Sequence, residues 1–340
     1  MRAVGYTTGM LDRARLAAVP EAEVARDAAT AHGVAASVAY LGSDAALRSL
    51  AVDPYWPKWD SPWWHMVLLH ELGEARQIPP RAVAAMVAGL DGLLHSFPIR
   101  PEDTAGVDLQ RDLACHCALG CMYQVLSACG VDVEQALPWI APWLARYQMA
   151  DGGLNCDESA YLVTHECPSS MVGTVPAFEA MLVRGEQRDF LRRAARFLIE
   201  RRLTEGSPTA HNAAERAAAP AWRQPTFPRF YFYDVLRGLG ALVRWAELTG
   251  DAVPAAAVQV ASELAARFPD GVVRVERQAW TAHGTIQPAD PAPRPRSPAS
   301  RFALLDATSA IGTPSEALTR GWTAARQALI RLIDAGQIIA

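Results

Sequence analysis

Residues 147–158 read YQMADGGLNCDE, and the chain continues through THECPSS at 164–170 into an apolar run that ends at Leu182. The Asp-Gly-Gly sequence favours a turn with positive φ at a glycine, so we expect a helix to end just before it. Pro168 suits the first position of the following helix, because proline has no N–H to leave unbonded there. The segment therefore predicts two helices joined by an acidic connection.

Three soft side chains lie on this connection: Cys156, His165 and Cys167. They precede a helix N-terminus, where anions and thiolates are favoured. Buried cysteines are also common without any function, so a structural helix hairpin with buried thiols explains the same residues. The residue types leave both interpretations open.

The composition excludes several classes of protein. The 340 residues are 51% hydrophobic, enough to bury a large core. The net charge is -4 and no basic cluster is interleaved with aromatic residues, so we expect no nucleic-acid partner. The chain has neither an 18-residue uncharged apolar run nor an apolar leader, so we expect no membrane span and no signal peptide. We therefore expect a cytoplasmic protein whose six cysteines are thiols or metal ligands.

Helical patterns dominate the chain, and helices that are apolar nearly all round alternate with amphipathic ones. That alternation suits a double layer, in which an inner ring is packed on both faces and an outer ring touches water. The expected helices are 21–36, 38–51, 63–73, 80–97, 112–130, 133–149, 168–182, 188–203, 230–249, 255–268, 301–310 and 316–335, and the inner ones are 63–73, 112–130, 168–182, 230–249 and 301–310. No break in composition separates the halves, so we expect one all-α domain over residues 1–340.

Two long segments, 204–228 and 281–300, do not fit the helical pattern, apart from a possible short helix at 213–219. Connections of this length are usually functional lids or disordered.

A dense aromatic cluster occupies DPYWPKWDSPWWH at 53–65. Ser61 is suited to cap a helix whose first residue is Pro62. The tryptophans on this segment either line a pocket or fill a core. They are Trp56, Trp59, Trp63 and Trp64.

Several motifs resemble a known family. They are DGGLNC at 151–156, the Ser169-Ser170 helix start with Thr174 and Glu179, FLIERRL at 197–203, Phe227-Pro228, and YDVLRGL at 233–239. Together they are similar to bacterial prenyltransferase or squalene-cyclase-like proteins of the terpenoid cyclase/protein prenyltransferase class, over about residues 60–280. The resemblance implies an (α/α) toroid whose inner helices point their N-termini at a central cavity. The chain lacks the Asp-x-Asp-Asp box of class II cyclases, and Tyr231 stands near the position of a zinc-binding histidine in protein prenyltransferases.

Two sets of residues are candidates for the chemistry. Zinc takes four ligands from thiolate, imidazole and carboxylate groups. The predicted metal set is Cys117, Cys156, His165 and Cys167, and His116 is a further candidate ligand. The predicted catalytic residues are His165, Asp234 and Tyr231, and the predicted substrate-binding residues are Trp59, Trp63, Trp64 and Tyr233. A cap on the helix at 230–249, with an ion pair to Arg237, explains Asp234 equally well.

The resulting functional hypothesis is an enzyme that acts on an isoprenoid or other lipophilic small molecule in an aromatic-lined cavity, with zinc as a candidate cofactor. Cyclisation, prenyl transfer and elimination are the reactions considered. One alternative is a non-catalytic toroid that binds a lipophile or a partner. Another is a metal-dependent hydrolase or lyase acting on a polar substrate, which a cavity lined mainly by charged side chains would favour.

Overall fold

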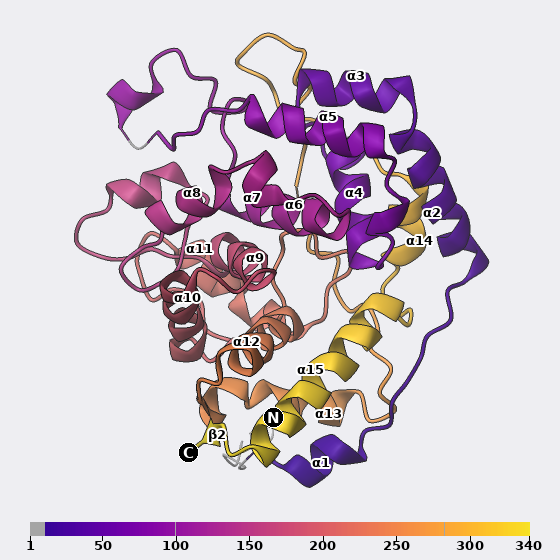
Figure 1. Cartoon of the computed structure of the whole chain (residues 1–340), viewed down its shortest axis with the longest axis vertical. Helices are drawn as coiled ribbons and strands as arrows, with labels where there is room; N and C mark the ends of the chain where they lie inside the picture. The colour runs from indigo at the N-terminus through magenta and orange to yellow at the C-terminus, as the bar shows by residue number, and fades with distance from the viewer. Residues whose placement is uncertain (1–10, 99, 282) are drawn as a thin grey trace, which may run out of the picture.

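A computed structural model describes residues 11–98, 100–281 and 283–340 and confirms the all-helical class (Figure 1). Over these residues it contains fifteen α-helices and one two-stranded parallel sheet, β1 (Val253–Pro254) with β2 (Ile338–Ile339). The helices are α1 (Arg13–Ala18), α2 (Ala28–Leu41), α3 (Asp44–Val52), α4 (Pro62–Glu71), α5 (Pro80–Asp91), α6 (His116–Ala128), α7 (Val133–Ala136), α8 (Ile140–Arg146), α9 (Met171–Leu182), α10 (Arg188–Glu200), α11 (Ala213–Ala218), α12 (Val235–Thr249), α13 (Val260–Arg267), α14 (Ala303–Thr308) and α15 (Glu316–Asp334).

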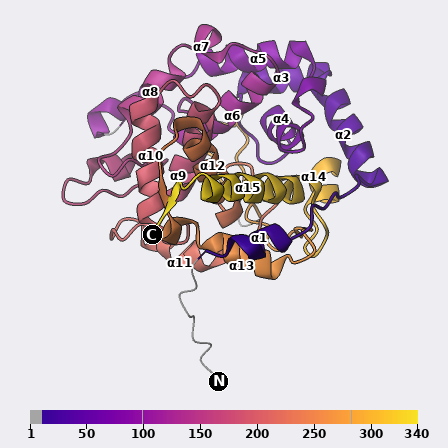
Figure 2. The same cartoon turned by 60° about the horizontal axis from the view of Figure 1, so that its bottom comes forward.

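Helices α4, α6, α9, α12 and α15 pack against one another in that order. Helices α2, α3, α5, α8 and α10 lie toward the periphery in both views (Figures 1 and 2). The backbones of α6 and α9 approach each other closely, because a Cβ on Gly120 would lie 2.4 Å from the carbonyl carbon of Pro176. Only glycine permits that approach of the two backbones.

The caps explain where the helices begin. Ser61 precedes α4 and Pro62 is its first residue, as predicted, but the Ser61 hydroxyl makes no capping hydrogen bond and donates to the Tyr55 carbonyl at 2.8 Å instead. Asp234 caps α12 by accepting a hydrogen bond of 2.8 Å from the Arg237 N–H. The prediction that Pro168 opens the next helix is wrong, because Ser170 is the cap and α9 begins at Met171.

Several other predicted helices are shorter than expected, and two of them show the physical reason. The predicted helix over 133–149 is divided into α7 and α8 around Pro138, since proline cannot donate to the preceding turn. The predicted helix over 21–36 begins later, because Asp27 caps α2 and accepts a hydrogen bond from the Thr30 N–H.

The two long connections both pack onto the helices. The first contains α11, as predicted, followed by a 3₁₀ turn at Ala219–Arg223. In the second, Thr285 and Ser297 form an antiparallel bridge. The Thr285 hydroxyl accepts a 2.6 Å hydrogen bond from the Lys58 backbone N–H, so this connection is fixed to the aromatic segment that precedes α4.

Candidate functional site

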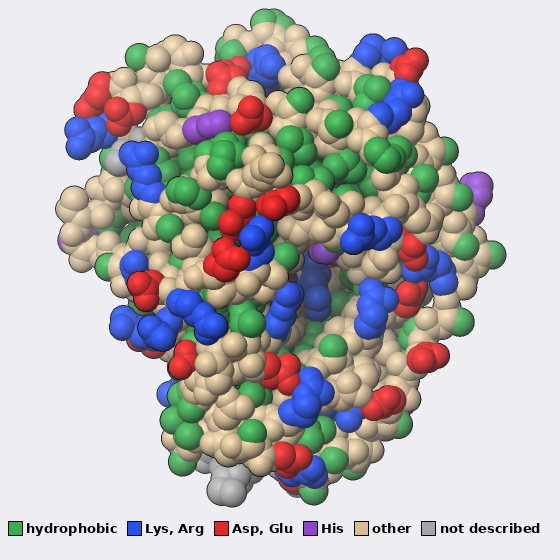
Figure 3. All heavy atoms as spheres, in the orientation of Figure 1, with side chains coloured by type: hydrophobic (Ala, Val, Ile, Leu, Met, Phe, Trp, Pro, Cys, Tyr) green, Lys and Arg blue, Asp and Glu red, His purple; other side chains and the backbone are tan. Residues whose placement is uncertain are grey.

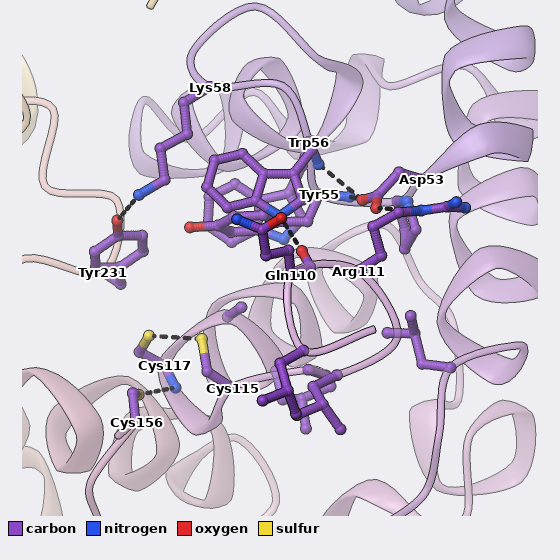
Figure 4. A pocket seen from close by; sticks show the side chains of 18 of the residues that line it. Asp53, Tyr55, Trp56, Lys58, Gln110, Arg111, Cys115, Cys117, Cys156 and Tyr231 are labelled. Atoms are coloured by element: carbon purple, nitrogen blue, oxygen red, sulfur yellow. Dashed lines mark hydrogen bonds and ion pairs between the residues drawn. The ribbon is translucent and has the colours of Figure 1, made fainter. Parts of the chain in front are cut away.

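A pocket of about 420 Å³ lies at the N-terminal ends of α4, α6 and α9 (Figure 4). Its volume falls in the range of small-molecule sites. Most of its wall is apolar or aromatic, and it includes Tyr55, Trp56, Trp63, Phe97 and Val172. The pocket also contains a small number of reactive side chains, which lie on two parts of its wall.

The first reactive group consists of three thiols. Cys115 is the cap of α6, Cys117 lies in its first turn, and Cys156 comes from the loop after the Asp-Gly-Gly turn. Their sulfur atoms all lie within 4.8 Å of one another. The Cys115 and Cys117 sulfurs are 3.1 Å apart, and the Cys117 N–H donates to the Cys156 sulfur at 3.3 Å (Figure 4). We call this group the thiol cluster.

The thiol cluster favours one negative charge over three. Hydrogen bonds from Cys117 and Cys156 lower the pKa of Cys115, while the same bonds raise the pKa of the other two thiols. The N-terminal end of α6 adds a favourable potential for the thiolate. Three converging sulfurs of this kind could hold a metal ion.

The second reactive group is an amine paired with a phenol. Lys58 is only 6% exposed, and its Nζ donates to the Tyr231 hydroxyl at 2.8 Å (Figure 4). Burial lowers the pKa of Lys58 to about 8 and raises the pKa of Tyr231 well above its ordinary value. The Tyr231 phenol therefore stays neutral near pH 7, while part of the Lys58 population is a free amine.

Four of the predicted site residues line this pocket: Trp63, Cys117, Cys156 and Tyr231. The predicted substrate-binding residues Trp59 and Trp64 are buried and do not line this pocket. Their ring centroids are 4.4 Å apart.

The other predicted residues lie elsewhere. His165 is exposed, and Cys167 lies beside Asp151 and Ser169. Neither belongs to the thiol cluster in the part of the chain that the structure describes. The side chain of His116, which follows Cys115, is also outside the cluster, and its ring packs among Phe97, Tyr147 and Tyr161.

Asp234 and Tyr233 are buried and already bonded. Besides capping α12, Asp234 forms an ion pair of 3.0 Å with Arg229, and the Tyr233 hydroxyl donates to the Leu203 carbonyl at 2.7 Å. The predicted pair between Asp234 and Arg237 is wrong, because the Arg237 guanidinium pairs with a carboxylate of α9 instead. Neither Asp234 nor Tyr233 lines the aromatic pocket.

A second pocket, of about 440 Å³, lies farther along the same helices. The face in Figure 3 is hollowed near its centre, and basic side chains surround the hollow. In this pocket Arg237 and Glu179 approach to 2.7 Å. Glu71 accepts backbone N–H groups of Arg229 and Phe230 at 2.9 and 2.6 Å. We call it the arginine pocket.

Sequence reasoning missed two members of the aromatic pocket as site residues. Cys115 belongs to the Cys-His-Cys sequence at 115–117, and two thiols so close in sequence were a signal for it. Lys58 has a simpler signal, because it is the chain's only lysine.

No protein-family model matches the chain, and no curated protein and no solved structure is significantly similar to it. Across the described residues, no helix combines the length and the apolar character needed to cross a membrane.

Proposed function

We propose that the protein is a terpenoid-cyclase- or prenyltransferase-like enzyme that acts on an isoprenoid or another lipophilic small molecule in the aromatic pocket. Zinc held by Cys115, Cys117 and Cys156 is the proposed cofactor. The observation that carries this proposal is the convergence of three thiols on the wall of an apolar pocket, at the N-terminus of a buried helix. Apolar walls with a few convergent polar groups are the usual form of a small-molecule site.

The arrangement of the helices supports the toroid that belongs to this proposal. The N-terminal ends of α4, α6 and α9 all face the pocket, and Tyr231 lies just before α12. These helices follow one another in space as they do in sequence. In an (α/α) toroid the inner helices are expected to open onto one cavity in this way.

The donor set supports zinc. Three thiolates are suitable zinc ligands, and a three-ligand site leaves a fourth position for water or substrate. Bound zinc would supply a Lewis acid or would activate a sulfur or oxygen nucleophile.

The chain's own residues would do the remaining work. Tyr55, Trp56 and Trp63 would hold an apolar substrate away from water. Their ring faces would also stabilise a positive charge that develops on it.

Metal analysis together with native mass spectrometry tests the proposal. Protein purified without chelators should contain about one zinc per chain, and it should retain a lipophilic ligand or bind an added isoprenoid alcohol such as farnesol. Protein purified with reduced thiols that contains no stoichiometric metal would contradict the zinc site. Failure to bind any lipophile would contradict the substrate class.

The charged lining of the arginine pocket is the observation that would favour a hydrolase or lyase acting on a polar substrate. Its principal charges are bonded to one another, so it supplies fewer groups that are free to act on a substrate. The aromatic pocket is therefore the better site.

A further inference from the structure

The chain uses lysine once. Of its 32 Lys and Arg residues, Lys58 alone is a lysine, so arginine supplies every other cationic side chain of this kind. Exposed cations are interchangeable in many surface positions, whereas arginine cannot lose its proton in a protein. A single lysine in an otherwise arginine-only protein therefore marks a position where the properties of an amine matter.

The position of Lys58 also indicates that an amine is needed there. It is buried in the wall of the aromatic pocket, and its Nζ lies 5.2–5.8 Å from the centres of the rings around it. The rings are those of Tyr55, Trp56, Trp59, Trp64 and Tyr231. In the part of the chain that the structure describes, Lys58 forms no ion pair with a carboxylate, and Tyr231 is its hydrogen-bond partner.

We propose that Lys58 is a catalytic nucleophile that forms an imine with an aldehyde or ketone group on the lipophilic ligand of this pocket. The proposal rests on the aromatic pocket described under the proposed function, but it does not require the zinc ion. It narrows the ligand class from a lipophile to a lipophilic carbonyl compound.

The chemistry balances with groups present in the pocket. The neutral amine of Lys58 attacks the carbonyl carbon, a C–N bond forms as the C=O π bond breaks, and one proton moves from the nitrogen to the oxygen to give a carbinolamine. The hydroxyl leaves as water with a proton supplied by the neutral Tyr231 phenol, and the phenolate takes back the remaining N–H proton as the C=N bond forms. The Tyr231 hydroxyl is already 2.8 Å from the reacting nitrogen.

Burial supplies the reactive form of the amine. With its pKa lowered to about 8 from 10.5, Lys58 has about 300-fold more neutral amine at pH 7 than an unperturbed lysine. Desolvation in an apolar pocket is an established way to activate a lysine for imine formation. The alternative is a structural cation held over aromatic rings, which needs no free amine.

Reductive trapping separates these two roles. The full-length protein is treated with decanal and cyanoborohydride at pH 7, with Nα-acetyl-lysine as an internal reference, and the modified peptides are mapped by mass spectrometry. We expect a secondary amine at Lys58 that carries the decyl group, formed faster than on the reference lysine. The N-terminal amine is resolved by its own peptide and shows the background rate.

Two variants sharpen the result. Lys58→Arg keeps the positive charge and cannot form an imine, so its mapped peptide should carry no adduct. Cys129→Ser, outside the pocket and outside the thiol cluster, should be labelled at Lys58 like the natural protein. If Lys58→Arg does not fold, the rate comparison within the natural protein still decides the question.

Some outcomes would overturn the proposal. Labelling of Lys58 no faster than the reference, or only at the N-terminus, would leave Lys58 as a structural cation. A tryptophan fluorescence titration with decanal then measures whether the pocket binds the aldehyde without forming an imine. Binding without an adduct contradicts the imine alone, whereas absence of both binding and adduct contradicts the lipophile pocket as well.

Discussion

The two pockets are built on the same helices but treat their polar groups in opposite ways. The arginine pocket contains more charge, and its principal charges are tied to one another or to backbone groups. The wall of the aromatic pocket is more apolar, although Asp53, Arg111 and Glu158 also lie on it, and an amine and three thiols face its cavity without carboxylate partners (Figure 4). Mutually satisfied charges fix helices in place, whereas reactive groups kept free in an apolar site are what chemistry requires.

The largest expected effect is on the stability provided by the arginine pocket. Arg237 joins α12 to Glu179 and donates to the carbonyls of Phe230 and Phe232, both at 2.9 Å. Arg237→Ala leaves a carboxylate and two carbonyls without their partner, so we expect a loss of about 3–5 kcal/mol in the free energy of unfolding. Urea denaturation measures this loss.

The matched control is Arg192→Ala, whose ion pairs are exposed and loose. It should change the free energy of unfolding by less than about 0.5 kcal/mol. A loss below about 1 kcal/mol for Arg237→Ala would mean that the arginine pocket is not a structural network, and the contrast between the two pockets would fail.

The next largest effect concerns metal affinity in the aromatic pocket. Cys156→Ser removes one sulfur of the thiol cluster, so zinc affinity should fall by at least about 100-fold, since loss of even an outer-shell partner approaches that value. Competition with a chromogenic chelator measures the affinity. Cys129→Ser is the control, because its thiol donates to the Ala75 carbonyl away from the cluster. Equal affinities in the two variants would exclude the proposed zinc site.

The contrast also explains how much could be predicted from sequence. Helical periodicity and caps are local, so the all-helical class and the start of α4 at Pro62 were predicted correctly. The pairing of Cys117 with Cys156 followed from placing both near helix N-termini. Which residues of the loop point into the pocket depends on tertiary packing, which local sequence patterns do not determine. His165 is exposed and Cys167 lies beside Asp151, because α9 begins at Met171, three residues after its predicted start at Pro168.

Charged residues near helix starts were the harder case. Asp234 has the residue type of both a cap and a catalytic acid, and only the position of Arg229 and the α12 backbone shows that its oxygens are already bonded. No local pattern marks the Lys58 amine, since its hydrogen-bond partner Tyr231 lies 173 residues away along the chain. The sequence marks Lys58 only by the fact that it is the single lysine of the chain.

A smaller effect is expected from Glu71, the partly buried acid of the arginine pocket. Burial raises the pKa of Glu71 to about 7 from 4.5. The folded state thus prefers the protonated acid, so the contribution of Glu71 is fully present below pH 4.5 and is lost as the pH rises through 7. The full shift corresponds to about 3.4 kcal/mol, and partial exposure of the residue reduces our expectation to about 2 kcal/mol.

Glu71→Gln tests that expectation. The difference in the free energy of unfolding between the natural protein and Glu71→Gln should shift in favour of the variant between pH 4.5 and pH 7.5. Arg229, Arg237 and His70 face the same cavity in both proteins, so their own titration largely cancels in the difference. A difference that is constant with pH would show that Glu71 keeps an ordinary pKa.

The smallest effect concerns the amine–phenol pair of the aromatic pocket. Tyr231→Phe removes the hydroxyl that accepts the Lys58 hydrogen bond, so we expect a loss of about 1 kcal/mol in the free energy of unfolding at pH 7. Without its acceptor the buried ammonium is disfavoured further. Because a lowered folded-state pKa weakens stability as the pH falls, the loss should be larger at pH 7 than at pH 9.

The measurement is urea unfolding of both proteins at the two pH values. Cys115, Cys117 and Arg296 also influence Lys58, but they are unchanged in the variant and largely cancel in the comparison. Tyr123→Phe serves as the control, because its hydroxyl lies 3.4 Å from Glu134 at the edge of hydrogen-bonding range and should give a smaller loss. A loss in Tyr231→Phe that does not depend on pH would mean that the Lys58 amine does not titrate in this range. The contrast between a reactive pocket and a structural one would then rest on the thiols alone.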